Sequence, residues 1–409
     1  MKKVLTNKYN LIYLLAIMVY MVVCVFVYWE HRLDIMNTTV YAFSYKYGFM
    51  ARGVLGTLLW QYDNLVPFDA ISYNTIYFIS KVATAIFFVM LLWFVIAVLS
   101  KCDEKRTNSA KAVLAVLILI SVPMFLSSDN FGRLDVYLMI ITLFCLILLI
   151  YEKAEWLIVP AVTLAALIHE GFVFMNLNII LVLLLYKCIV KTEKKVRIKY
   201  IIILALTFIL PSIIFLYCEF FSHHYGTEVF DECYALAAKV SVDNLPHKEV
   251  LAHEILGFDV AGVEQEFHKW NLEDSSIFIV LFSPYIIFMT MVFRKYAKSA
   301  KTGIDKFITF IVLAGTLTLL PELILKVDYG RYVYAILFYY LAIFVTLLTL
   351  RDERIEQVFD HYKGVVIKHK WIAILGVAAL FIFTPFRGYR ICDIVTLLSY
   401  MIYGAPMRA

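Results

Sequence analysis

The sequence predicts an all-α fold, a polytopic integral membrane bundle of about 10–12 transmembrane helices that forms a single domain over residues 1–409. Hydrophobic residues make up 63% of the chain, charged residues make up 17%, and the mean hydropathy is +0.82. Soluble domains carry about 45–50% apolar and about 25% charged residues. Apolar runs of about the 20 residues that a helix needs to cross a bilayer also recur along the whole chain.

The first apolar run, 11–29, is too long for a signal peptide and ends in an aromatic pair, so we expect it to stay as the first span. The stretch 157–186 is too long for one span and is expected to fold as a tight hairpin. A final run, 391–404, is marginal. The remaining spans are expected at about 76–99, 112–127, 134–151, 200–218, 276–293, 307–325, 331–350 and 371–386.

The positive charge predicts the orientation. With the N-terminus in the cytoplasm and 157–186 as a hairpin, most of the 37 Lys and Arg residues fall in inside segments, as basic loops require. A single crossing at 157–186 would place the basic segment 187–199 outside. We therefore expect a multi-pass protein of the bacterial plasma (inner) membrane, with two long outer segments: 30–72, which carries an interfacial helix at about 48–60, and 219–274.

No motif indicates a cofactor. The seven Cys residues are scattered without a CxxC pair, and no Walker, GxSxG or zinc signature is present. The net charge of +5 follows from topology and does not indicate a nucleic-acid partner. We expect no metal and no cofactor.

Polar residues gather at the expected outer helix ends. In the first outer loop, Asp34 and Arg52 have two interpretations: a tethered amphipathic loop, or a carboxylate held near the bilayer beside the Arg. His169-Glu170 falls near the tip of the hairpin, where ionisable groups usually face a cavity or a partner. His169 is a candidate base or a group that binds an anion, and Glu170 either orients His169 or pairs with an Arg from another loop. The alternative is an exposed pair at a hairpin tip.

Two similar segments begin outside-to-inside helices. One holds Asp129, Gly132-Arg133 and Asp135, and the other holds Asp328 and Gly330-Arg331. A Gly permits close backbone approach, and an Arg fork suits phosphate or carboxylate, so two such segments facing one cavity would suit a diphosphate. In the alternative interpretation, each Asp caps its own helix and pairs with its neighbouring Arg.

The segment 219–274 is acidic and contains five of the nine His residues. Its pattern predicts short helices at 228–240 and 247–256, in a lid or substrate-binding loop. His223-His224 and His253-Glu254 raise the alternative of a metal site, although their spacing matches no standard motif. A third interpretation is a solvated acidic cap.

The chain resembles bacterial membrane glycosyltransferases with the GT-C fold and the envelope polysaccharide polymerases related to them. The resemblance lies in the topology and in Arg52-Gly53, Gly132-Arg133, His169-Glu170 and Gly330-Arg331. It implies a polyprenyl-(di)phosphate sugar donor at the outer leaflet. GT-C enzymes use a first-loop acid as base, often with a metal, whereas the polymerase branch uses Arg and His. The first loop here has no tandem acidic pair, which favours the polymerase version.

The leading hypothesis is therefore a repeat-unit polymerase for capsule, exopolysaccharide or O-antigen. Arg133 and Arg331 would bind the lipid diphosphate with help from Arg52, and His169 or Asp34 would act as base. The expected partners are a polyprenyl-linked glycan, membrane lipid and an assembly complex for the polysaccharide. The alternatives are a transporter or flippase of a lipid-linked or anionic solute, and a non-catalytic scaffold or acyltransferase.

Overall fold

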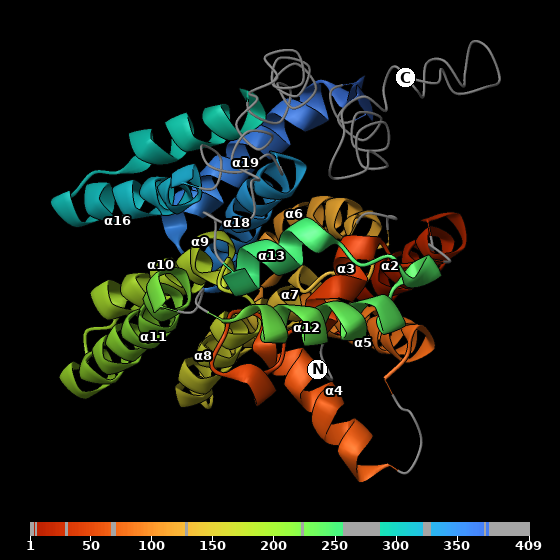
Figure 1. Ribbon diagram of the computed structural model, residues 1–409. Coiled ribbons are helices and arrows are strands. Elements are labelled where there is room, and N and C mark those ends of the chain that lie inside the picture. Colours follow the sequence, from red (N-terminus) through yellow and green to blue (C-terminus); the bar gives the residue numbers. More distant parts are fainter. Residues whose placement is uncertain are drawn as a thin grey trace.

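The computed structural model describes residues 4, 6–28, 32–66, 71–126, 130–221, 225–256, 287–321, 329–371 and 374–375. Within these ranges the chain is helical with short turns, and no described residue lies in a strand, so the all-α prediction is confirmed (Figure 1). The main helices are α2 (Lys8–Tyr28), α5 (Tyr73–Lys101), α6 (Glu104–Met124), α7 (Asp135–Tyr151), α8 (Ile158–Ile168), α10 (Leu177–Val190), α11 (Lys194–Phe221), α16 (Gly303–Ala314), α18 (Tyr329–Thr349) and α19 (Glu353–Lys368).

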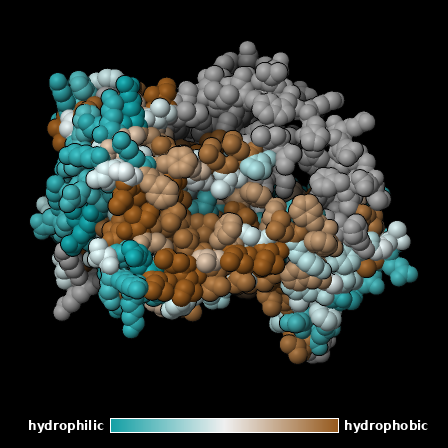
Figure 2. All heavy atoms as spheres, turned by 90° about the vertical axis from the view of Figure 1, so that its left-hand side faces the viewer, coloured by the Kyte–Doolittle hydropathy of each residue, from teal (hydrophilic) through white to brown (hydrophobic). Residues whose placement is uncertain are grey.

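Five helical segments of the described chain are long and apolar enough to cross a membrane: Lys8–Phe26, Tyr73–Lys101, Glu104–Met124, Lys194–Phe221 and Arg331–Thr349. Three shorter apolar helices accompany them: Asp135–Tyr151, Glu155–Ile168 and Leu177–Val190. Figure 2 shows a broad apolar surface bordered on its left by a hydrophilic edge. These helices are typical of a membrane protein. The number of 10–12 spans stays a prediction, because 276–286 and nearly all of 371–386 and 391–404 lie outside the described residues.

The helices run between two ends of the bundle. α5 and α7 are parallel: the rings of Tyr77 and Phe131 lie 5.7 Å apart near their first residues, and Lys101 Nζ lies 5.9 Å from the Tyr151 ring near their last. The stretch 157–186 contains α8 and α10, joined through residues 169–176, in agreement with the predicted hairpin. We call the end that holds Lys101 the basic end and the opposite one the Arg52 end.

Ion pairs connect the helices at the basic end. Glu152, after α7, accepts from Lys187 and Lys191 of α10 at 2.7 Å and 3.0 Å. Arg106 and Lys105 of α6 both pair with Glu356 of α19. Lys199 of α11 pairs with Glu155, in the 3₁₀ turn η3 (Glu155–Leu157) that precedes α8. The basic segments predicted to share one membrane face therefore meet in the structure.

Two helix boundaries differ from the sequence prediction. The expected span 112–127 begins earlier, at Glu104, because Asp103 accepts from the Arg106 amide and caps α6. The expected span 307–325 is not one α-helix, because α16 ends at Ala314 and a 3₁₀ turn, η6 (Gly315–Leu319), follows it. Asn178 Nδ2 donates to the Gly315 carbonyl at 2.9 Å, which gives this broken backbone a polar partner.

The outer segment 30–72 contains α3 (Ile35–Thr39), two 3₁₀ turns, η1 (Val40–Ala42) and η2 (Tyr45–Tyr47), and the helix α4 (Gly53–Leu65). The helix expected at about 48–60 is therefore shifted toward the C-terminus. Gly48 and Arg52 have φ of 130° and 60°, and these left-handed conformations keep the helix from starting before Gly53.

The described part of 219–274 confirms the two predicted helices, as α12 (Thr227–Val240) and α13 (Lys248–Leu256) with the 3₁₀ turn η4 (Val242–Asn244) between them. We call residues 225–256 the lid, and Figure 1 shows α12 and α13 in green, in front of the bundle. The lid rests on α3: Thr38 Oγ1 lies 3.1 Å from Ser241 Oγ, and the His247 amide donates to Thr39 Oγ1 at 2.9 Å. Residues 257–274 lie outside the described chain.

Candidate functional site

Several predicted site residues lie together at the Arg52 end. They come from the start of α4, the start of α7, the end of α8 and the start of α18, and the lid adds one carboxylate. We call this group the arginine cluster, and its members are Arg52, Arg133, Asp135, His169, Glu170, Glu254 and Arg331.

Arg52 and Glu170 form the central ion pair. Arg52 Nε and Nη2 both donate to Glu170 Oε1, at 3.1 Å and 2.6 Å. The two side chains are only 11% and 5% exposed. The carboxylate of Glu170 is thus the acceptor of two N–H groups from a buried guanidinium, a charge-assisted contact.

Two further features of this pair are common at functional sites. The Arg52 backbone is left-handed, with φ of 60° and ψ of 9°, a conformation that costs a non-Gly residue about 1–3 kcal/mol. Glu170 Oε2 is buried and accepts no hydrogen bond from a described residue. Buried polar atoms usually have partners, so an unused carboxylate oxygen in this position is available to a hydrogen-bond donor of a ligand.

His169 ends α8 in an extended conformation, and its amide donates to the Ala165 carbonyl at 3.0 Å. Its Nδ1 lies 3.0 Å from the Gly171 amide nitrogen and 3.3 Å from Glu170 Oε1. A ring nitrogen either accepts or donates, so Nδ1 serves one of these neighbours at a time. When Nδ1–H donates to Glu170, the Nε2 lone pair is free, and this is the form that a general base requires.

Arg331 joins the two Gly-Arg segments. Its Nη2 donates to Asp135 Oδ1 at 2.9 Å, so Asp135 pairs across the bundle and not with Arg133, its neighbour in sequence. Asp135 is also within electrostatic range of Arg133 and His169, and Arg331 is within range of Arg52. The alternative of two self-contained caps concerns Asp129 and Asp328, and it stays untested. Asp129 and Asp328, the other acids of these segments, lie outside the described residues.

Gly132 positions Arg133. Its φ is 84°, and a Cβ at this position would run into the Leu33 side chain and approach Ser80. A glycine is needed here because the turn is left-handed and the backbone lies directly against α5. Arg133 itself is 6% exposed, and its Nη2 lies 3.9 Å from Met36 Sδ.

Glu254 of the lid is a member that the sequence reasoning did not place in the site. Its Oε1 lies 3.2 Å from Arg52 Nη2, and the side chain is 7% exposed. The sequence does contain a signal for it. Leu251, Glu254 and Ile255 share one helical face by their spacing, and in the structure all three are buried.

Asp34 has a different place from the one expected. It is exposed and accepts from the Met36 amide at 2.8 Å, which caps α3. Arg52 pairs with Glu170 and Glu254 and not with Asp34. A short polar side chain at the start of a helix satisfies a backbone N–H that has no partner inside the helix, and this local contact accounts for the position of Asp34.

The described residues contain no group of three His, Cys, Asp or Glu side chains that would hold a metal ion. The alternative of a metal site in 219–274 is largely untested, because most of its candidate ligands are not described. These are His223, His224, His268 and the side chain of His253.

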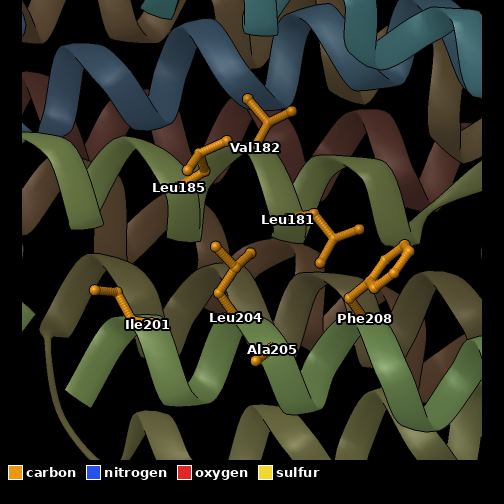
Figure 3. A pocket seen from close by; sticks show the side chains of 7 residues that line it. All are labelled: Leu181, Val182, Leu185, Ile201, Leu204, Ala205 and Phe208. Atoms are coloured by element: carbon orange, nitrogen blue, oxygen red, sulfur yellow. The ribbon is translucent and has the colours of Figure 1, made fainter. Parts of the chain in front are cut away.

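An apolar groove of about 340 Å³ lies between α10 and α11 (Figure 3). Its lining is apolar, unlike that of the arginine cluster. Aliphatic side chains and one ring line it, and it offers no polar atom for chemistry. Its lining residues are Leu181, Val182, Leu185, Ile201, Leu204, Ala205 and Phe208.

Comparisons with known proteins assign the chain to no family. A scan against protein-family models, a search of curated proteins and a search of solved structures each found no match.

Proposed function

We propose that this chain is a membrane glycosyl-transfer enzyme that acts on a polyprenyl-(di)phosphate-linked oligosaccharide, in the manner of a polysaccharide repeat-unit polymerase. The observation that carries the proposal is the gathering of Arg52, Arg133 and Arg331 with the His169–Glu170 pair at one end of an apolar bundle. Three guanidinium groups in a largely buried position suit a phosphorylated lipid head, because Arg binds such groups through paired hydrogen bonds.

The reaction follows from the charges. A hydroxyl oxygen of the acceptor attacks the anomeric carbon, and the bond from that carbon to the lipid diphosphate breaks. Negative charge grows on the leaving diphosphate, and Arg133 and Arg331 stabilise it, with Arg52 assisting. The proton of the hydroxyl passes to Nε2 of His169, whose Nδ1–H is then held by Glu170 Oε1.

The orientation completes the proposal. Basic segments favour the cytoplasmic side, so the Arg52 end faces outward from a bacterial plasma membrane and the N-terminus lies in the cytoplasm. The lid then covers the outer face of the site, where it helps to select the acceptor glycan. Membrane lipid and the other proteins of a polysaccharide assembly complex are the partners of this arrangement.

The proposal is tested with Arg133→Ala and Arg331→Ala, each assayed for polymer length with a lipid-linked oligosaccharide. Both variants should give short or no polymer, because the leaving diphosphate loses a cation in each. Lys46→Ala is the matched control, since Lys46 pairs with Glu232 at the exposed surface of the same end. Wild-type polymer from two well-folded Arg variants would overturn the assignment. Movement of the lipid-linked glycan across proteoliposomes with no covalent product would instead establish a transporter.

A further inference from the structure

The apolar groove lies against α11, a helix that packs little against the rest of the bundle. Of the five described helices long enough to cross a membrane, α11 has the lowest buried share, 22% of its apolar stretch. Two of its groove residues, Ile201 and Phe208, are exposed. The groove has the volume and apolar lining of a ligand site, and lipid chains are as apolar as its side chains. A hydrocarbon chain therefore suits it.

The face of α11 that lines the groove becomes basic beyond one end of the groove. Figure 3 shows Ile201 at one end and Phe208 at the other. Arg197 and Lys194 precede Ile201 by four and seven residues, so they share its side of the helix, and both are exposed. Arg197 lies about 6 Å from Ile201 along the axis, at 1.5 Å per residue. The groove is thus apolar along its length and has cations next to the end that Ile201 marks.

The fold does not use these cations. The segment 187–199 holds six Lys and Arg residues, and three of them pair with acids of the bundle. The paired residues are Lys187, Lys191 and Lys199. No described residue pairs with the side chains of the other three, which are Lys194, Lys195 and Arg197. The one acid of the segment is Glu193, so two positive charges at the start of α11 are balanced by no described residue.

An anion would relieve this arrangement. The first turn of α11 contains no acid, so its cations face the positive end of the helix macrodipole. Lys and Arg residues close to a membrane surface each gain about 1 kcal/mol from anionic lipid heads. The groove suits a hydrocarbon chain and the cations suit a negative head, and one anionic phospholipid supplies both.

We propose that the groove between α10 and α11 binds an anionic phospholipid of the bilayer. One acyl chain lies along Ile201, Leu204 and Phe208, and the phosphate lies at Lys194 and Arg197. The head is then at the basic end and the chain runs along α11 into the bundle, which is the order of head and chain within one leaflet. This site is separate from the arginine cluster, so it stands whether or not the proposed function does.

The test is thermal unfolding of the full chain in dodecyl maltoside, after washing until mass spectrometry finds no bound phospholipid. A ligand that binds only the folded state raises the unfolding temperature as its concentration rises. Dioleoyl phosphatidylglycerol should do so. Dioleoyl phosphatidylcholine has the same chains without net charge, and it should require higher concentrations. Glycerol 3-phosphate, a phosphate head without chains, should have no effect.

One variant tests the head of the lipid. Lys194→Gln/Arg197→Gln should raise the phosphatidylglycerol concentration needed for a given shift by about 30-fold, because it removes two contacts of about 1 kcal/mol each. Lys363→Gln/Lys368→Gln is the matched control, since it removes two exposed cations from α19 and should change the response little. An equal loss in this control would overturn the site in favour of general surface charge.

A second variant tests the chain of the lipid. Ala205→Trp fills the groove at an exposed position, so it should weaken the response to both phospholipids. Leu206→Trp is its control, because it places the same ring on α11 outside the groove lining. Wild-type responses from Ala205→Trp would overturn the groove as the seat of the chain. Equal responses of wild type to the two phospholipids would overturn the anionic head. The absence of any shift would show that neither lipid occupies the groove, as when another segment of the chain covers it.

Discussion

Arg331 at the start of α18 donates to Asp135 at the start of α7 across 2.9 Å, although the two residues are 196 positions apart in the chain. The side chains are 9% and 13% exposed. This contact makes one site out of two Gly-Arg segments that are similar in sequence and distant along the chain. The stability of the Arg52 end therefore depends on this pair, and so does the proposed binding of a lipid diphosphate.

Breaking this pair on one side should cost more than removing it completely. Arg331→Gln leaves Asp135 as a buried charge without its ion-pair partner, and such losses cost about 3–5 kcal/mol. The double variant Arg331→Gln/Asp135→Asn removes both charges and should recover part of the thermal unfolding temperature, measured on the protein in detergent. Lys46→Gln breaks an exposed pair and should change that temperature little. A double variant no more stable than the single one would contradict this account of the pair.

Gly132→Ala should destabilise the protein and weaken binding of farnesyl diphosphate. The new Cβ meets Leu33 at a φ of 84°, and relief of that contact moves the following residue, Arg133. A left-handed backbone alone costs a side chain about 1–2 kcal/mol. Thermal unfolding and binding are measured together. Gly364→Ala is the control, because its Cβ meets nothing within 4 Å in the exposed helix α19, and it should slightly stabilise the protein. A Gly132→Ala protein with wild-type stability would show that the turn adapts.

The basic end should lose stability in acid through Glu152. Burial would raise the pKa of this carboxyl, but Lys187 and Lys191 outweigh burial and lower it from 4.5 to about 2. The folded pKa is the lower one, so the contribution of Glu152 is complete above pH 4.5 and disappears as the pH falls toward 2. Glu152→Gln should unfold at a lower temperature than wild type at pH 6, and the difference should shrink as the pH is lowered through this window. A constant difference would exclude Glu152 as the titrating group.

The two ends should be accessible from opposite sides of the membrane. Glu228 is exposed on α12 of the lid, and Lys105 is 66% exposed at the basic end. A membrane-impermeant maleimide applied to intact cells should label Glu228→Cys at once and Lys105→Cys only after permeabilisation. The six described cysteines are buried and give a low background. Labelling of Lys105→Cys in intact cells would show that the basic end faces outward, opposite to the predicted orientation.

Sequence reasoning predicted the helices well where hydropathy and caps agree. The lid helices and α7 begin and end within one residue of the prediction, because polar residues border their apolar faces. The predicted bounds were wrong where a helix extends past its apolar part, as in α6. They were also wrong where a helix is interrupted at a tertiary contact, as after α16. The bond from Asn178 to the Gly315 carbonyl comes from a helix far away in the chain, and hydropathy contains no information on it.

For the arginine cluster too, the sequence predicted local features better than tertiary contacts. The Arg and His members were predicted because charges near apolar runs are few and easily noticed. The pairing of Glu170 with an Arg of another loop was one of the predicted alternatives, and Arg52 is that Arg. The pairs Asp135–Arg331 and Arg52–Glu254 were not predicted. Pairing depends on which helix ends are adjacent, and short sequence motifs do not contain that adjacency. For Glu254, the spacing shows only that it shares a helical face with Leu251 and Ile255, and the contact of that face with Arg52 depends on the tertiary fold.

The short hairpin of α8 and α10 determines how deep His169 and Glu170 lie. From Glu155 to Ile168 the chain rises about 21 Å at 1.5 Å per residue, whereas the hydrocarbon layer is about 30 Å thick. If the base of the hairpin is level with the inner headgroups, His169 and Glu170 lie about 9 Å below the outer boundary of the hydrocarbon layer. A lipid-linked substrate would then reach them sideways from within the leaflet, while a water-soluble acceptor would have to descend from above, past α12 and α13.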